Sequence, residues 1–104
     1  MAEHKRSILW SPEALEDIDH LWDYYAEVAG RASADKLLRQ IAKIISTIEE
    51  FPSAGRLRNE IRADLRSLSA GSHVVFYRLK HDRLEIVRVL DGRRDLDEIF
   101  SEGG

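Results

Sequence analysis

The chain has 104 residues, of which 43% are hydrophobic and 34% charged, and its formal net charge is −3. This length and composition indicate one globular domain, residues 1–104, and exclude a multidomain chain. No apolar run approaches the roughly 20 residues that span a membrane, no signal peptide is recognisable at the N-terminus, and there is no cysteine, so we expect a cytoplasmic protein that makes no membrane contact.

The net charge conceals a separation along the chain. Residues 1–55 and 95–104 are acidic, whereas residues 56–94 carry ten basic and five acidic side chains. Nine of those ten are arginine, whose planar guanidinium binds phosphate or carboxylate through two parallel hydrogen bonds. The sequence therefore predicts a positive surface on this part of the chain. The alternative is a solvated surface whose arginines pair with the acidic helices.

A short strand and two helices are expected first. Lys5–Trp10 is predicted to form the strand, and Ser11-Pro12-Glu13 then signals a helix start, with a hydroxyl N-cap, a proline and a carboxylate near the positive end of the helix dipole. Gly30 ends this helix, and a second one is predicted over 31–50, before Phe51-Pro52. The apolar stripes comprise Leu15, Ile18, Trp22, Tyr25 and Ala29 on the first helix, and Ala34, Leu37, Leu38, Ile41, Ile44, Ile45 and Ile48 on the second. The short break predicts an antiparallel helical hairpin.

Three strands are expected after a basic loop over residues 53–64. They are Leu65–Ala70, His73–Leu79 and Leu84–Leu90, and the short turns between them predict antiparallel neighbours. Together these elements predict an α+β fold, in which an N-terminal strand and a two-helix antiparallel hairpin pack on a twisted antiparallel sheet.

The middle strand, His73–Leu79, is apolar on both faces. Val74 and Phe76 point one way and the alternate residues the other, yet a two-helix hairpin covers only one face of a sheet. Two interpretations stay open. Either the C-terminal segment around Leu96, Ile99 and Phe100 closes the second face, or that face is a groove for an amphipathic segment of another chain.

A second apolar row on the first helix favours the groove. Leu21, Tyr24 and Val28 lie outside the main stripe at 100° per residue. We therefore expect a partner chain to contact these three residues together with Val74 and Phe76.

The order of these elements, together with several short sequence motifs, resembles the ParE branch of the ParE/RelE superfamily of bacterial toxin–antitoxin systems. The resemblance extends from about Ser7 to Phe100 and rests on the combination of these motifs. The motifs are Trp10-Ser11-Pro12-Glu13-Ala14, Asp17-Ile18, Leu21-Trp22-Asp23-Tyr24, Ile48-Glu49-Glu50-Phe51-Pro52, Gly55-Arg56, Leu65-Arg66-Ser67, Val75-Phe76-Tyr77-Arg78, Ile86-Val87-Arg88-Val89-Leu90 and Gly92-Arg93-Arg94-Asp95-Leu96.

The resemblance implies a small cytoplasmic toxin, held inactive in a hetero-oligomer by a ParD-like antitoxin whose C-terminal segment wraps it. ParE-type members inhibit DNA gyrase, whereas RelE-type members cut mRNA on the ribosome without metal, and the two branches share a fold. Gyrase is therefore the expected target, with DNA contacted only indirectly through antitoxin or gyrase and no cofactor required. A ribosome-dependent mRNA endonuclease of RelE type is the alternative.

Site chemistry distinguishes the two branches. Metal-free RNA cleavage needs a proton acceptor, cations for the phosphorane and a donor to the leaving oxygen. By the resemblance, the strand arginine of RelE-type sites corresponds to His73, the turn arginine to Arg94 and the tyrosine to Phe100. Phenylalanine has no proton to give, so we expect no catalytic residue and no enzymatic activity, unless His73 acts with Arg94.

These considerations fix the expected surfaces. Arg93, Arg94, Arg66 and His73 are expected to face the target, whereas Leu21, Tyr24, Val28, Val74 and Phe76 are expected to bind the antitoxin. No metal site is expected, because Asp17, Asp19 and Asp23 are expected to line the surface of the first helix, where no nitrogen or sulfur ligand is near except His20.

Overall fold

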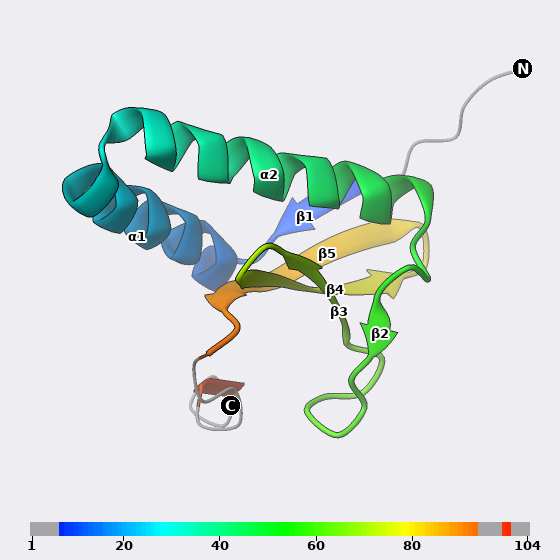
Figure 1. Cartoon of the computed structure of the whole chain (residues 1–104). Coiled ribbons are helices and arrows are strands. Elements are labelled where there is room, and N and C mark those ends of the chain that lie inside the picture. The colour runs from blue at the N-terminus through cyan, green and yellow to red at the C-terminus, as the bar shows by residue number, and fades with distance from the viewer. Residues whose placement is uncertain (1–6, 94–98, 101–104) are drawn as a thin grey trace, which may run out of the picture.

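The computed structural model of the chain describes residues 7–93 and 99–100, except for the side chain of Ala70. Two helices lie on one side of a five-stranded sheet, and the short segment that holds Ile99 and Phe100 lies on the other side (Figure 1). In chain order the elements are β1 (Ser7–Trp10), α1 (Pro12–Ala29), α2 (Arg31–Glu50), β2 (Arg56–Leu57), β3 (Arg66–Ala70), β4 (His73–Lys80) and β5 (Arg83–Asp91). No helix in the described ranges is long and apolar enough to cross a membrane.

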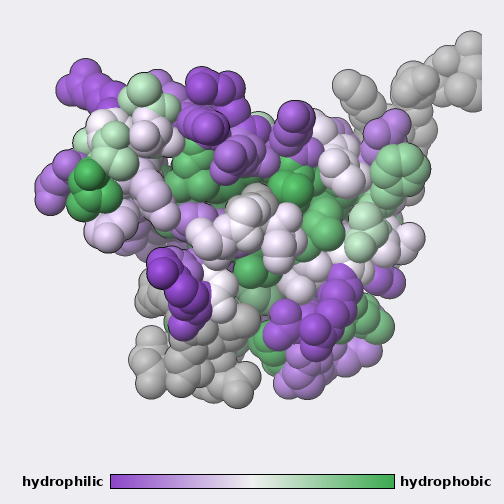
Figure 2. All heavy atoms as spheres, viewed as in Figure 1, coloured by the Kyte–Doolittle hydropathy of each residue, from purple (hydrophilic) through white to green (hydrophobic). Residues whose placement is uncertain are grey.

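The helices begin and end where the sequence signals them. The Ser11 hydroxyl oxygen accepts a hydrogen bond from the Ala14 amide at 3.0 Å, so it caps α1. Gly30 separates the helices at φ 94°, a backbone conformation that favours glycine. The predicted helical hairpin is confirmed, and Figure 2 shows mainly hydrophilic side chains along the outer side of α2.

The α+β fold is confirmed, but the sheet is mixed rather than purely antiparallel. Its strand order is β1-β5-β4-β3-β2, and β1 runs parallel to β5. The three consecutive strands are antiparallel as predicted, with bounds that shift by one residue. The predicted loop 53–64 contains β2, a two-residue edge strand paired with β3, which is too short to leave a periodic signal. Lys5 and Arg6 of the predicted first strand lie outside the described residues.

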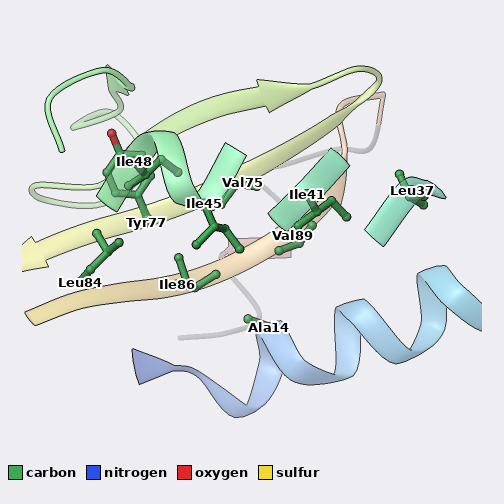
Figure 3. Close-up of a cluster of buried hydrophobic side chains, with 10 residues drawn as sticks. All are labelled: Ala14, Leu37, Ile41, Ile45, Ile48, Val75, Tyr77, Leu84, Ile86 and Val89. Atoms are coloured by element: carbon green, nitrogen blue, oxygen red, sulfur yellow. The ribbon is translucent and has the colours of Figure 1, made fainter. Parts of the chain in front are cut away.

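The main core lies between the helices and the sheet. Figure 3 shows Ile48 of α2 beside Tyr77 of β4 at one end of this core, and Leu37 near the other end. The buried residues are Ala14, Leu37, Ile41, Ile45, Ile48, Val75, Tyr77, Leu84, Ile86 and Val89. They match the predicted stripe of α2 and one face of β4.

A β-bulge allows β5 to contribute apolar residues to both faces of the sheet. Phe76 pairs with Arg88 and Tyr77 with Ile86, so Val87 is the extra residue on β5. The bulge shifts the alternation: Ile86 and Val89 lie in the main core, and Val87 lies in the core on the opposite face. Without it, Ile86 and Val89 would point to opposite faces.

The second face of the sheet is closed by the chain itself. Phe76 is fully buried there against Phe100, with ring centroids 5.0 Å apart. Leu65, Val87 and Leu90 complete this smaller core, and Ile99 packs against it. The interpretation that the C-terminal segment covers this face is confirmed for Ile99 and Phe100, whereas Leu96 lies outside the described residues.

The carboxylate of Asp17 joins α1 to β5. Arg88 donates to it through Nε at 2.8 Å and Nη2 at 2.9 Å, and the Val89 amide donates at 2.9 Å. The register of β1 ends at Ile86, so this part of β5 has no strand on its outer side. Asp17 is buried and takes the place of a strand partner there. Asp17 was expected on the helix surface, and that expectation was wrong.

Replacing Asp17 with alanine should lower the free energy of unfolding by about 3 kcal/mol or more, because Arg88 and the Val89 amide lose their acceptor while partly or fully buried. Urea denaturation measures this change. Asp19→Ala removes the same side chain from an exposed position of the same helix and should change stability by less than about 0.5 kcal/mol. Equal effects of the two substitutions would contradict this role for Asp17.

Candidate functional site

Two residues expected to face the target meet at one end of the sheet. His73 begins β4 and lies directly opposite Asp91, near the end of β5. Arg93 follows two residues later and folds back onto the Asp91 carboxylate, to which its Nε donates at 3.0 Å, its Nη2 at 2.7 Å and its amide at 2.9 Å. The Arg93 side chain is still 82% exposed. This end of the sheet therefore presents to solvent the guanidinium of Arg93, which its hydrogen bonds to Asp91 keep in place.

The ion pair fixes the charge of both partners. The side-chain and amide hydrogen bonds from Arg93 hold the pKa of Asp91 far below its usual range, and Asp91 in turn raises the pKa of Arg93. Both groups are thus ionised at neutral pH. Because the pair is exposed, it costs little to exchange Asp91 for an acidic group of another molecule.

His73, unlike Arg93, is not on the surface. It is only 2% exposed and packs against the ring of Tyr25, with centroids 5.7 Å apart. Within the described residues its Nε2 has no hydrogen-bond partner. Burial lowers the pKa of His73, the nearby Asp91 carboxylate opposing this shift, so the imidazole is neutral at pH 7. His73 therefore packs against Tyr25 inside the fold and does not present a charged group to a partner.

The side chain of Arg66 is hydrogen-bonded within the fold. Its Nη1 donates to the Gly55 carbonyl at 2.8 Å, and Tyr77 bonds the same loop, accepting from the Gly55 amide at 2.8 Å and donating to the Pro52 carbonyl at 2.6 Å. A Cβ on residue 55 would lie 2.5 Å from the Tyr77 hydroxyl, so only glycine fits. Arg66 lies four residues from the turn before His73, about 13 Å along β3. The structure does not bring it together with Arg93.

Ion pairs neutralise part of the arginine-rich surface. Among the nine basic residues of 56–94 that the structure describes, four make ion pairs, which are Arg58 with Glu60, Arg78 with Glu85, Arg88 with Asp17 and Arg93 with Asp91. Arg62 stacks over the Phe100 ring at 5.2 Å. Of these four arginines Arg88 pairs with an acidic helix, as the alternative expected. Arg58, Arg78 and Arg93 pair instead with acidic residues of the loop and the strands. Arg94 lies outside the described residues.

The residues expected to bind an antitoxin divide into accessible and covered ones. Tyr24 and Val28 are both more than half exposed. Leu21 is partly buried and packs on the main core, Val74 is partly buried on the second face, and Phe76 is fully covered. Tyr24 and Val28 are therefore the two that a partner can reach directly.

The facing of α1 differs from its predicted stripe. Leu15, expected inside, is 52% exposed, whereas Ala14 and Asp17 are buried. Ile18, Leu21 and Tyr25 pack against the main core beside them. The pattern of apolar residues alone gave the wrong buried face for α1, because the face that is buried includes the carboxylate of Asp17.

Tyr24 and Tyr25 connect the helix surface with the Arg93 surface. Their rings make an edge-to-face contact with centroids 5.4 Å apart, and both hydroxyls are close enough to influence the pKa of Arg93. We call the exposed residues Tyr24, Val28 and Arg93 the hairpin-end surface. In the described part of the chain, no three His, Asp or Glu side chains gather closely enough to hold a metal ion.

Comparison with known proteins identifies the family. Residues 8–96 match the family model described as the ParE toxin of the type II toxin–antitoxin system parDE. Toxin ParE1 of Mycobacterium tuberculosis is 38% identical over 90 residues, which cover 86% of this chain and 92% of that protein. Toxin ParE1 of Caulobacter vibrioides is 39% identical over 80 residues, covering 77% and 82%.

The chain belongs to the ParE toxin family. It is thus a ParE-type toxin of a type II toxin–antitoxin system, as the resemblance implied. A solved structure titled as the chromosomal ParDE system of P. aeruginosa shares its fold, with a TM-score of 0.73, 22% identity and coverage of 86% of this chain and 98% of that one.

The geometry of this ParE toxin separates the residues that would have to cooperate in a RelE-type site. His73 packs against Tyr25 on the helix side of the sheet, whereas Phe100 packs against Phe76 on the opposite side. Phe100 is buried and has no ionisable group. Of the three residues that the resemblance aligned with RelE-type positions, the two that the structure describes therefore lie on different faces of the sheet.

The buried His73 should make the stability of this ParE toxin depend on pH. Its pKa in the folded state lies below the value of 6.5 in the unfolded chain, so the unfolded state takes up the proton first. Its contribution is complete above pH 6.5 and is lost as the pH falls through the folded-state pKa. The free energy of unfolding, measured in urea at pH 7.5 and at pH 5, should fall less in His73→Phe than in the unmodified protein. An unchanged pH dependence would contradict a buried, neutral His73.

Proposed function

We propose that this ParE toxin inhibits DNA gyrase in the cytoplasm as a single domain without enzymatic activity, and that a ParD-like antitoxin neutralises it in a hetero-oligomer. The observation that carries the proposal is the separation of His73 from Phe100 by the sheet. General acid–base cleavage needs its groups within hydrogen-bonding reach of one substrate. A phenylalanine on the far face of the sheet supplies no such group.

The hairpin-end surface is suited to contact the target. An exposed arginine beside an exposed tyrosine is a composition enriched in binding hot spots. Arg93 can exchange the Asp91 carboxylate for an acidic group of gyrase through the same two-pronged geometry. We include Arg94, the next residue in the sequence, in the target-facing surface, and His73 packs behind this surface against Tyr25. Arg66 bonds the Gly55 loop instead and lies apart from it. DNA is then contacted only through gyrase or the antitoxin.

The same surface explains neutralisation. Tyr24 and Val28 are four residues apart on α1 and so lie on one face of the helix, where an apolar segment of an antitoxin can bind. Because Tyr24 lies near enough to Arg93 to raise its pKa, an antitoxin seated on α1 can also cover the target-facing arginine. Neutralisation then follows from occlusion, without any change of fold.

Inhibition of gyrase should depend on Arg93. The purified toxin should block supercoiling of relaxed plasmid by gyrase, and Arg93→Glu should raise the concentration needed for half inhibition at least tenfold, since it reverses the charge at the centre of the surface. Arg39→Glu makes the same change on the exposed side of α2 and should leave inhibition unaltered.

A parallel assay in translating extract tests the RelE-type alternative. Intact transcripts are expected at toxin concentrations that stop gyrase. Normal supercoiling at saturating concentrations of folded toxin, together with cleaved transcripts, would contradict the proposal.

Antitoxin binding should depend on the apolar row of α1. Tyr24→Ala with Val28→Ala should weaken binding of the antitoxin encoded beside the toxin at least tenfold, because both side chains are exposed and accessible to a partner. Calorimetric titration measures the affinity. Leu15→Ala, which truncates an equally exposed side chain elsewhere on the helix, should have little effect, and a loss equal to that of the double variant would locate the contact elsewhere.

A further inference from the structure

Two cations face each other at the end of the β4–β5 hairpin. Lys80 and Arg83 are directly opposite in the register and flank the two-residue turn His81-Asp82, and both side chains are exposed. Like charges at directly opposed positions of an antiparallel pair are unfavourable. The preceding polar pair of the same ladder, Arg78 and Glu85, has opposite charges and forms a salt bridge at 2.6 Å. The hairpin end is thus a place where the fold tolerates repulsion that an anionic partner would relieve.

An amphipathic hollow lies beside this pair. It has a volume of about 500 Å³ and is lined by Ser7 and Leu9 of β1, by Lys80 and Arg83, and by the turn residues. Leu9 is 45% exposed, although it is a large apolar residue in a strand. The register places Ser7 beside Arg83, and Leu9 beside Glu85. One partner segment can therefore meet an apolar side chain and two cations within two adjacent rows of the sheet.

The chemistry favours an acidic peptide over nucleic acid. Phosphate backbones are bound by cations and hydrogen-bond donors, and they gain little from an apolar side chain. In this hollow Leu9 is accessible, and the evenly spaced phosphates of a nucleic acid could not avoid the Glu85 carboxylate, whereas a peptide can place an uncharged group there. A peptide can present carboxylates to Lys80 and Arg83, an apolar side chain to Leu9 and a hydrogen-bond donor to Glu85.

We propose that this hollow is a second docking site for the antitoxin, filled by an acidic segment that places an apolar side chain on Leu9 and carboxylates between Lys80 and Arg83. The inference rests on the proposed antitoxin partnership. The hollow lies at the opposite end of β4 from His73, seven residues or about 23 Å away. An antitoxin that engages both ends binds at two linked sites, so each contact raises the effective concentration for the other.

The test compares antitoxin binding by the unmodified toxin with binding by the double variant Lys80→Ala, Arg83→Ala. The matched control is the double variant Arg39→Ala, Lys43→Ala, which removes two exposed cations from α2. Affinity is measured by calorimetric titration with the antitoxin encoded in the neighbouring reading frame, at 50 and at 300 mM salt. For the Lys80/Arg83 variant only, binding should be at least tenfold weaker and should depend less on the salt concentration. Its thermal midpoint should equal or exceed that of the unmodified toxin, because a repulsive pair has been removed.

Each other outcome overturns the inference in a distinguishable way. Equal affinity of the unmodified toxin and the Lys80/Arg83 variant overturns this site and leaves the partnership intact. Absence of binding by the unmodified toxin overturns the partnership and the site together. If titration with duplex DNA shows binding that depends on Lys80 and Arg83, while antitoxin binding does not, the hollow is a nucleic-acid site instead.

Discussion

The bond between the Asp17 carboxylate and β5 sets the position of the helical hairpin on the sheet. Three donors from Arg88 and Val89 converge on this one side chain, just beyond the point where the register of β1 ends. From this anchor α1 runs toward its C-terminal end, where Tyr25 reaches His73. The hairpin-end surface thus depends on a buried carboxylate two turns away along the helix.

Closure of the sheet on both faces decides how the toxin can act. Phe76 and Phe100 fill the second face, and the imidazole of His73 is buried on the first. Among the described residues, the surface left accessible to partners includes an exposed arginine and tyrosine at one end of β4, and two opposed cations beside Leu9 at the other end. We propose that a toxin with such a surface works by binding, and that its antitoxin works by covering the surface.

The helix bounds and the antiparallel pairing of β3, β4 and β5 followed from the sequence because they depend on local signals, whereas the parallel pairing of β1 with β5 did not. Pro12, Gly30 and the two short turns mark boundaries whatever the tertiary contacts are. The phase of α1 did not follow, since Asp17 turns inward only because the amide of Val89, 72 residues away, lacks a strand partner. Arg66 was expected to face a target because nothing in the sequence shows that it bonds Gly55. Along β5 the apolar residues Ile86, Val87 and Val89 break the strict alternation of a strand, and this break is the signal that could have predicted the bulge.

The most direct test of the account is hydrogen–deuterium exchange of the toxin alone and bound to gyrase. The account predicts that gyrase slows exchange in the last two turns of α1 and around residues 91–93, while the second sheet face around Phe76 and residues 99–100 is unchanged. Protection confined to the second face, with no change at the end of α1, would contradict it.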